Sequence, residues 1–89
     1  MALTPQQWKD DWRNRGQESF LQGATLHSAD YTAPSEEWTH DHCEFCWATF
    51  SEDPAPDEFP RGYTTSDCRH WICQECFHDL KDIFSWQTE

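Results

Sequence analysis

Two pairs of cysteines with the same short spacing constrain this chain more than any other feature. Cys43 and Cys46 form one Cys-x-x-Cys pair, and Cys73 and Cys76 form the other. A single pair is also found in redox motifs, but two pairs can supply the four thiolates of the tetrahedral site that structural zinc prefers. We therefore predict one structural Zn²⁺ ion bound by these four cysteines; iron would fit the same set of ligands.

The residues around the two pairs predict different local structures. After the second pair, Cys76, Leu80 and Phe84 recur at helical spacing, so this pair would lie in the first turn of a helix, where free N–H groups stabilise thiolates. The first pair lies among aromatic residues in a turn-like segment, which favours a zinc knuckle at the end of a hairpin. A knuckle followed by a helix-borne pair is the treble-clef arrangement, so we predict a small α+β fold of this kind.

Length and composition indicate a single domain with a small core. The chain has 89 residues, 16% of them aromatic, with six tryptophans. A chain this short often needs a metal to supplement its core. We expect one domain over residues 1–89, in which an N-terminal helical region (1–23) precedes a zinc-binding module (24–86).

The N-terminal region carries strong helix-start signals. Thr4 is a good N-cap, Pro5 suits the first helical position, and Gln7 can complete a capping box. Gly23 is a plausible stop. The pattern predicts one amphipathic helix over about residues 5–21, with its charged residues in solvent.

The remaining elements are predicted to be short. A strand is expected within residues 24–31 and an extended segment over 38–42. Three prolines and four acids at 51–60 indicate an exposed acidic loop that joins no ladder. Residues 62–65 and 69–72 would form a hairpin with its turn at 66–68, and residues 85–89 would fray unless Trp86 folds back.

Three tryptophans admit two interpretations. Trp8 and Trp12 lie one helical turn apart, and Trp86 lies near the end of the sequence. Aromatic stripes usually cover a core, so these side chains would pack over the zinc module. Alternatively, one or two of them contact a partner, as exposed tryptophans often do.

Other potential metal ligands lie near the cysteine pairs. His40, His42 and His70 are expected to support the ligands through hydrogen bonds or ring packing. A second metal site, or a site of three cysteines and one histidine, remains an alternative. Cys68 could replace a ligand or join His70 at a second metal, but we favour a turn residue with no required chemistry.

Charge and sequence pattern limit the functional classes. The formal net charge is −11, which should repel nucleic acid. No signal peptide or membrane span is visible, and the odd count of five cysteines favours reduced thiols, so we expect a cytoplasmic protein. A zinc ion closed by four cysteines has no open position for substrate water, so we expect no enzyme activity.

Two longer motifs resemble those of a known group of proteins. Residues 38–47 read W-T-H-D-H-C-E-F-C-W, and residues 70–77 read H-W-I-C-Q-E-C-F. Over roughly residues 20–86 the chain is similar to a family of small, mostly uncharacterised bacterial zinc-binding proteins. This resemblance implies the four cysteines as ligands and places Trp38, His40 and His42 within the module. It implies no activity, and fold alone does not fix function.

Our leading functional hypothesis is a non-catalytic protein-interaction module with an acidic surface. Its partner would be a basic protein, as for an inhibitor or immunity-type protein that masks the basic site of a nuclease or toxin. The alternative is a nucleic-acid- or ribosome-associated zinc finger with a local basic patch. A redox or metal-handling role through Cys68 and the histidines is a further alternative.

Overall fold

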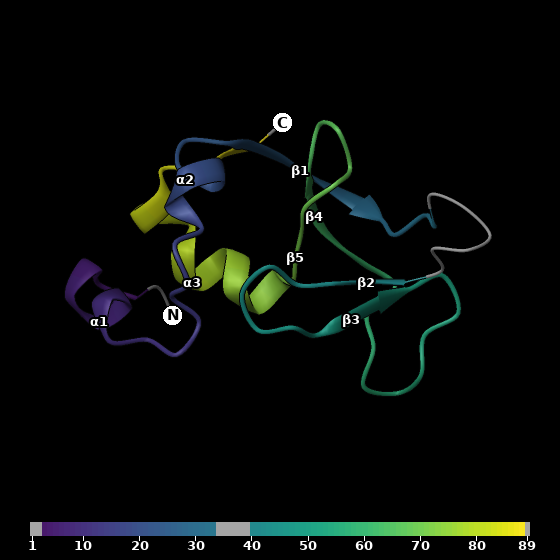
Figure 1. Ribbon diagram of the computed structural model, residues 1–89. Coiled ribbons are helices and arrows are strands. Elements are labelled where there is room, and N and C mark those ends of the chain that lie inside the picture. Colours follow the sequence, from purple (N-terminus) through teal and green to yellow (C-terminus); the bar gives the residue numbers. More distant parts are fainter. Residues whose placement is uncertain (1–2, 34–39, 89) are drawn as a thin grey trace.

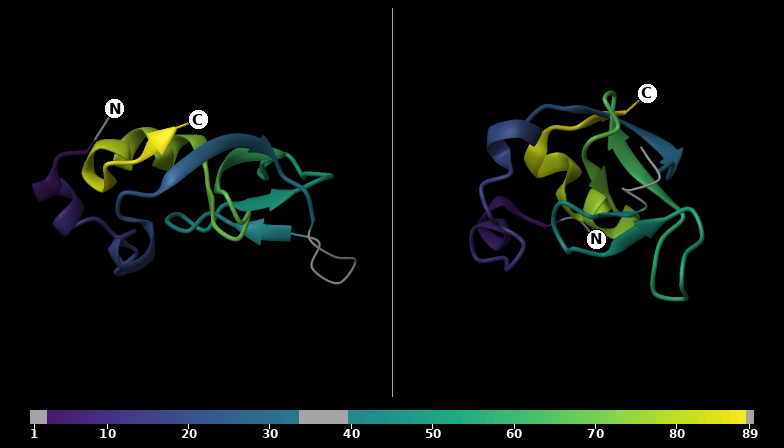
Figure 2. Two further views of the ribbon diagram at one scale, coloured as in Figure 1. Left: turned by 90° about the horizontal axis from the view of Figure 1, so that it is seen from above. Right: turned by 45° about the vertical axis from the view of Figure 1, so that its right-hand side comes forward.

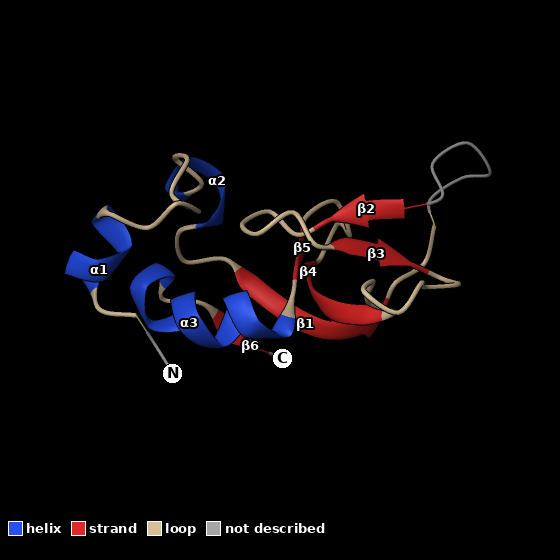
Figure 3. Ribbon diagram, turned by 90° about the horizontal axis from the view of Figure 1, so that it is seen from below, coloured by secondary structure: helices blue, strands red, loops and turns tan. Residues whose placement is uncertain are grey.

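The computed structural model describes residues 3–33 and 40–88, which form a small α+β fold (Figure 1). A four-stranded sheet has the order β5-β4-β1-β6, and β2 and β3 form a separate two-stranded sheet. The helices gather at one end of the molecule, and the β2–β3 hairpin lies toward the other (Figures 2 and 3). The elements are α1 (Pro5–Lys9), α2 (Glu18–Leu21), β1 (Thr25–Asp30), β2 (His40–His42), β3 (Thr49–Ser51), β4 (Arg61–Thr65), β5 (Trp71–Ile72), α3 (Gln74–Phe84) and β6 (Gln87–Thr88).

The single N-terminal helix predicted over 5–21 is wrong, because the chain forms two short helices there. The predicted start is confirmed: Thr4 caps α1, and Gln7 completes the capping box. Beyond α1, a carboxylate oxygen of Asp11 accepts the backbone N–H of Arg13 at 2.8 Å, and Gly16 has φ +82°. A side chain that bonds the local backbone competes with the helix ladder, and a left-handed residue interrupts it.

The main sheet contains the predicted hairpin and one unpredicted strand. β4 and β5 pair antiparallel, with Tyr63 opposite Ile72, and β1 pairs antiparallel with β4. Residues 85–88 do not fray: β6 lies parallel to β1, and the N–H of Gln87 donates to the carbonyl of Ala24 at 3.1 Å. Trp86 does fold back, since its indole N–H donates to the Leu21 carbonyl at 2.9 Å.

The β2–β3 hairpin packs closely on the main sheet. A Cβ added to Gly62 of β4 would lie 2.6 Å from a ring carbon of Phe50 and 2.8 Å from the carbonyl oxygen of Ile72. The prediction that the acidic loop joins no ladder is wrong at its end, where Phe59 forms an isolated bridge with Phe50. Trp38 and Thr39 of the predicted extended segment lie outside the described residues.

Aromatic rings form most of the core, as the composition predicts. The ring of Phe45 contacts those of Trp8, Phe84 and Trp86, with centroids 5.4 to 5.9 Å apart. On α3, Phe77 stacks on Tyr63 of β4 at 3.7 Å. These contacts join the helices to the sheet and hold the two cysteine pairs near one another.

Candidate metal centre

The four cysteines of the two pairs converge on one point. Their sulfur atoms all lie within 4.8 Å of one another, and those of Cys46 and Cys73 are 3.6 Å apart. A tetrahedron with Zn–S bonds of about 2.3 Å has sulfur–sulfur edges of about 3.8 Å. The group could therefore hold a metal ion, and soft thiolates suit Zn²⁺ or iron among the common metals.

The first pair lies in a tight turn at the end of the β2–β3 hairpin, as predicted. Cys43 directly follows β2, and its N–H donates to the carbonyl of Ala48 at 2.8 Å. The turn closes when the N–H of Trp47 donates to the carbonyl of Cys43 at 3.2 Å, with Trp47 at φ 66°. This geometry turns both sulfurs to one side of the hairpin end.

The second pair begins α3, which confirms the predicted helix-borne position. Cys73 is the N-cap, and its sulfur accepts the N–H of Cys76 at 3.5 Å. The N–H of Cys73 in turn donates to the sulfur of Cys43 at 3.3 Å. Each of these bonds favours a negatively charged sulfur, so the backbone prepares the cluster for a cation.

The four thiols ionise in competition with one another. Hydrogen bonding from Cys43 holds the pKa of Cys46 well below its usual range. Hydrogen bonding with Cys43 and then with Cys46 raises the pKa of Cys73 and of Cys76 far above it. Negative charges this close repel one another, so full ionisation of the cluster calls for a divalent cation between the sulfurs.

Arg13 is the clearest site residue that the sequence did not reveal. It was expected in solvent, yet it is only 8% exposed and donates to the sulfur of Cys76 at 3.4 Å. Its guanidinium also pairs with Asp11 at 2.8 Å and Asp79 at 3.1 Å. Hydrogen bonding to Asp11 is the largest cause that raises the pKa of Arg13, and the same contact lowers that of Asp11.

The segment between α1 and α2 also forms hydrogen bonds to the turn that carries Cys43 and Cys46. Arg15 donates to the carbonyls of Glu44 and Phe45 at 3.1 and 3.0 Å, and its guanidinium lies 4.9 Å from the ring centroid of Trp47. The amide of Gln17 donates to the Glu44 carbonyl at 3.0 Å. The sequence did not predict these contacts, because it placed the charged residues of this segment on the solvent side of one continuous helix. The contacts form only because the chain leaves the helix between α1 and α2.

The histidines contact the turn rather than joining the sulfurs. A ring nitrogen of His70 contacts a carboxylate oxygen of Glu44, and the ring of His42 lies 6.1 Å from that of Trp47. His40 packs against His42 at 5.2 Å. In the described part of the chain, the one group placed to hold a metal is the set of four cysteines. Cys68 lies exposed in the β4–β5 turn at φ 58°.

The tryptophans divide between core and surface. Trp8 and Trp86 are only 4% and 8% exposed and both belong to the aromatic core, so they offer little surface to a partner. Trp12 is 67% exposed and Trp47 is 59% exposed. Trp12 also lines a hollow of about 420 Å³ beside the metal centre, together with Arg13, Cys46, Glu75, Cys76 and Asp79.

Comparison of the chain with protein-family models, curated proteins and solved structures finds no match in any of the three. The similarity to small bacterial zinc-binding proteins thus stays a prediction. Over residues 3–33 and 40–88, no helix combines the length and the apolar character needed to cross a membrane.

Proposed function

We propose that this chain is a zinc-stabilised, treble-clef-like module of the kind that the two motifs resemble. The observation that carries the proposal is the convergence of four sulfurs, two from a turn at a hairpin end and two from the start of α3. The β4–β5 hairpin lies between the pairs in the sequence, as in a treble clef. Zinc bound there would clip the β2–β3 hairpin to α3 and supplement a small aromatic core.

The role that we propose is non-catalytic. Four thiolates fill the coordination of a tetrahedral zinc and leave no position for a substrate or an activated water. Three of the four cysteines are also buried, at 1 to 3% exposure. The metal would therefore act on structure, and function would lie on the surrounding surface.

We propose further that this surface binds a basic protein. The chain carries a net charge of −11. Two exposed tryptophans lie near the metal centre: Trp12 lines the same hollow as Cys46, and Trp47 follows Cys46 in the sequence. Exposed tryptophans are frequent anchors at interfaces, while unlike charges speed association. An inhibitor or immunity-type protein that masks a basic nuclease or toxin site is the concrete form of this proposal.

The structure weakens the support for the nucleic-acid alternative. This alternative needs a local basic patch, and a continuous helix over residues 5–21 would bring Lys9, Arg13 and Arg15 together. Instead, Arg13 is buried between two carboxylates, and Arg15 is bound to the turn and to Trp47. The redox alternative would need Cys68, which lies outside the four-sulfur group.

Affinity capture with matched variants tests the proposed surface. Zinc-loaded chain would be immobilised and exposed to lysate from its native source, at low and at high salt. The variants are Trp12→Ser with Trp47→Ser, and Phe59→Ser as the control, since Phe59 is also 41% exposed. We expect basic proteins on the wild type and the control, and their loss from the double variant and at high salt.

Two results would contradict the proposal. Equal recovery of the same proteins by all variants would remove the role of the tryptophans, and salt-sensitive recovery of nucleic acid would favour the alternative. Native mass spectrometry of each preparation would report its metal content. An equal zinc content in all variants would show that any loss of binding is not a loss of the metal centre.

A further inference from the structure

The four candidate ligands differ in how far solvent can reach them. Cys43, Cys73 and Cys76 are 1 to 3% exposed, whereas Cys46 is only partly buried. Within the four-sulfur group, Cys46 is therefore the side chain that a small molecule can reach. Access decides which sulfur a reagent meets first, because accessible thiolates react and buried structural cysteines are inert.

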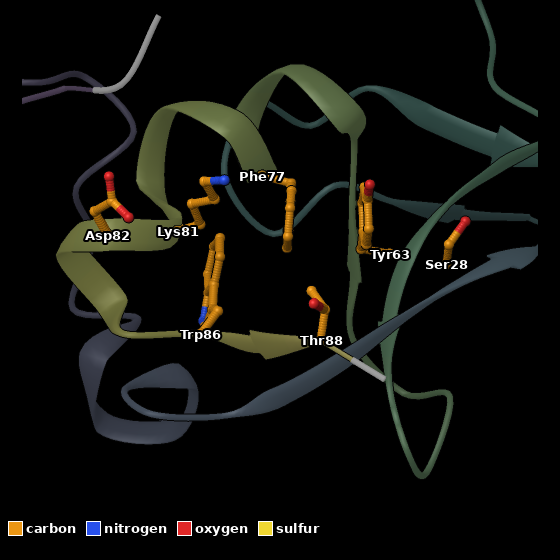
Figure 4. Close-up of a pocket in the computed structure, with 7 residues that line it drawn as sticks. All are labelled: Ser28, Tyr63, Phe77, Lys81, Asp82, Trp86 and Thr88. Carbon is orange, nitrogen blue, oxygen red and sulfur yellow. The ribbon is translucent and has the colours of Figure 1, made fainter.

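A hollow in the surface opens at Cys46. It has a volume of about 420 Å³, and its lining includes Trp12, Arg13 and Glu75 as well as Cys46 and Cys76. The larger hollow of about 460 Å³, between β1, β6 and α3, is lined by none of the four cysteines (Figure 4). A water molecule occupies about 30 Å³ in the liquid, so the hollow at Cys46 has room for a molecule as small as hydrogen peroxide.

Cys76 lines the same hollow but is shielded. It is 1% exposed, and its sulfur accepts a hydrogen bond from the guanidinium of Arg13 at 3.4 Å. The ion pairs of Arg13 with Asp11 and Asp79 hold that guanidinium in place. A charged donor stabilises a thiolate, and a stabilised thiolate is a weaker nucleophile. Attack on a reagent in the hollow therefore falls to Cys46.

The sulfur that would complete a disulfide with Cys46 already lies in contact with it. The sulfurs of Cys46 and Cys73 are 3.6 Å apart, although the two residues are separated by 27 positions in the sequence. Cys73 is the N-cap of α3, and its sulfur accepts the N–H of Cys76 at 3.5 Å. The two sulfurs would have to approach by about 1.5 Å to bond, and the bond would tie the turn of the first pair to the start of α3.

We propose that Cys46 is an oxidation site, at which a small peroxide entering the hollow converts Cys46 and Cys73 to a disulfide and thereby empties the metal centre. This inference rests on the zinc-binding role proposed above, because bound zinc keeps all four sulfurs as thiolates. It uses neither Cys68 nor the histidines, on which the redox alternative relied.

The oxidation proceeds in two balanced steps. The thiolate of Cys46 attacks one peroxide oxygen, the O–O bond breaks and hydroxide leaves with the bonding pair, so that Cys46 becomes a sulfenic acid. The thiolate of Cys73 then attacks the Cys46 sulfur, the S–O bond breaks and a second hydroxide leaves as the S–S bond forms. The two sulfurs together lose two electrons, the peroxide gains them, and both hydroxides take protons from solvent. Cys43 and Cys76 then remain as two ligands, too few for a structural zinc site.

The test exposes the zinc-loaded full chain to hydrogen peroxide and follows zinc release with a chromogenic chelator. Native mass spectrometry first establishes one zinc per chain, and a sample without peroxide gives the spontaneous rate of release. Cys68→Ser provides the background, because the exposed Cys68 would also react. We expect release of the zinc, a Cys46–Cys73 disulfide in peptide mapping, and labelling of Cys46 by dimedone, which traps sulfenic acids. A thiol reductant with added zinc should restore the loaded form.

Exchange of single ligands for histidine separates their roles, because zinc also accepts three cysteines and one histidine. In the Cys68→Ser background, Cys46→His removes the proposed site, whereas Cys43→His replaces a buried ligand of the same pair. We expect peroxide to release zinc about tenfold more slowly from Cys46→His than from the background, and at the background rate from Cys43→His. Disulfide mapping and dimedone trapping keep the ligands unchanged, so they decide the question if a histidine variant fails to bind zinc.

The outcomes separate this inference from the zinc-binding proposal. Zinc that stays bound under peroxide, a disulfide between Cys43 and Cys46, or dimedone on another of the four cysteines would overturn the inference and leave the zinc-binding proposal standing. A chain that binds no metal before oxidation would overturn both.

Discussion

At the scale of single residues, Arg13 links the N-terminal segment to the metal centre. Its guanidinium contacts a ligand sulfur and two carboxylates, and its main-chain carbonyl accepts the Gln17 amide at 2.7 Å. A buried cation beside four thiolates also offsets part of their negative charge. One side chain thus stabilises both the candidate ligands and the non-helical segment between α1 and α2.

Replacing this guanidinium should lower the stability of the fold. Arg13→Met would leave Asp11, Asp79 and the Cys76 sulfur without their shared donor, and we expect a loss of about 2–3 kcal/mol in the free energy of unfolding. Urea denaturation of the zinc-loaded forms measures it. Arg69→Met, at an exposed position, is the control and should change stability by less than about 0.5 kcal/mol. Equal midpoints for the two variants would show that Arg13 is not a structural link.

Tyr31 has a buried hydroxyl group in the core. It is 3% exposed, its oxygen has no hydrogen-bond partner within the described structure, and its ring packs on Trp71 at 5.1 Å. Tyr31→Phe keeps the ring and removes the unpaired group, so we expect stability to rise by about 1 kcal/mol, measured by thermal or urea denaturation. A decrease would mean that the hydroxyl is satisfied in solution.

The same residue predicts a pH effect. Burial raises the pKa of Tyr31 in the folded chain, so ionisation favours the unfolded state. Stability should therefore fall as the pH rises above about 10, the ordinary pKa of tyrosine. Unfolding curves on either side of that pH should show a smaller fall for Tyr31→Phe than for the wild type.

At the scale of elements, local signals in the sequence predicted those parts that depend on neighbours in the chain. The Thr4 cap, the β4–β5 hairpin and the start of α3 at Cys73 all follow from short-range chemistry. The pairing of β6 with β1 depends on contacts between distant segments, and the break after α1 combines the local bond of Asp11 and the turn at Gly16 with the distant contact of Arg13 to Cys76. The convergence of the four cysteines was predictable because metal coordination calls for two pairs with this spacing, whereas the Arg13 contact has no pattern in sequence.

Gly62 is an element-scale feature, since it sets how closely β4 approaches the β2–β3 hairpin. A methyl group there would meet both the Phe50 ring and the backbone of β5. Gly62→Ala should therefore force the hairpin away and cost about 2–3 kcal/mol. Circular dichroism during urea titration measures the change. Ser28→Ala is the control: Ser28 is an exposed residue of neighbouring β1 and loses only an exposed hydrogen bond from Arg61, so the change should be nearly neutral. Comparable curves for both variants would refute the close contact.

At the scale of the whole molecule, the candidate metal ligands and the aromatic core form one structure. The candidate ligands Cys43, Cys73 and Cys76 belong to the same buried cluster as Phe45, Phe77 and Phe84. This small core contains few aliphatic residues, so its packing gives limited stability. Without a cation, the repulsion between the four sulfurs would work against the folded state. The composition alone predicted that the small core would need a metal to supplement it, although it did not reveal the close ring packing.

Removal of the metal should therefore unfold the chain. With a strong chelator we expect loss of helical circular dichroism and a red shift of tryptophan emission as Trp8 and Trp86 meet water. Thiol titration should count one reactive cysteine in the zinc form, the exposed Cys68, and five in the apo form. A chelated protein that kept its spectra would overturn the structural role of the metal, and Cys68→Ser should abolish the single fast thiol.

The bonds from backbone amides to ligand sulfurs have a consequence for kinetics. The N–H groups of Cys73 and Cys76 are held by sulfurs that would also bind the metal. Deuterium could reach these two amides only when the cluster opens. Their exchange rates would therefore record how often a bound ion escapes, from within the protein and with no added probe.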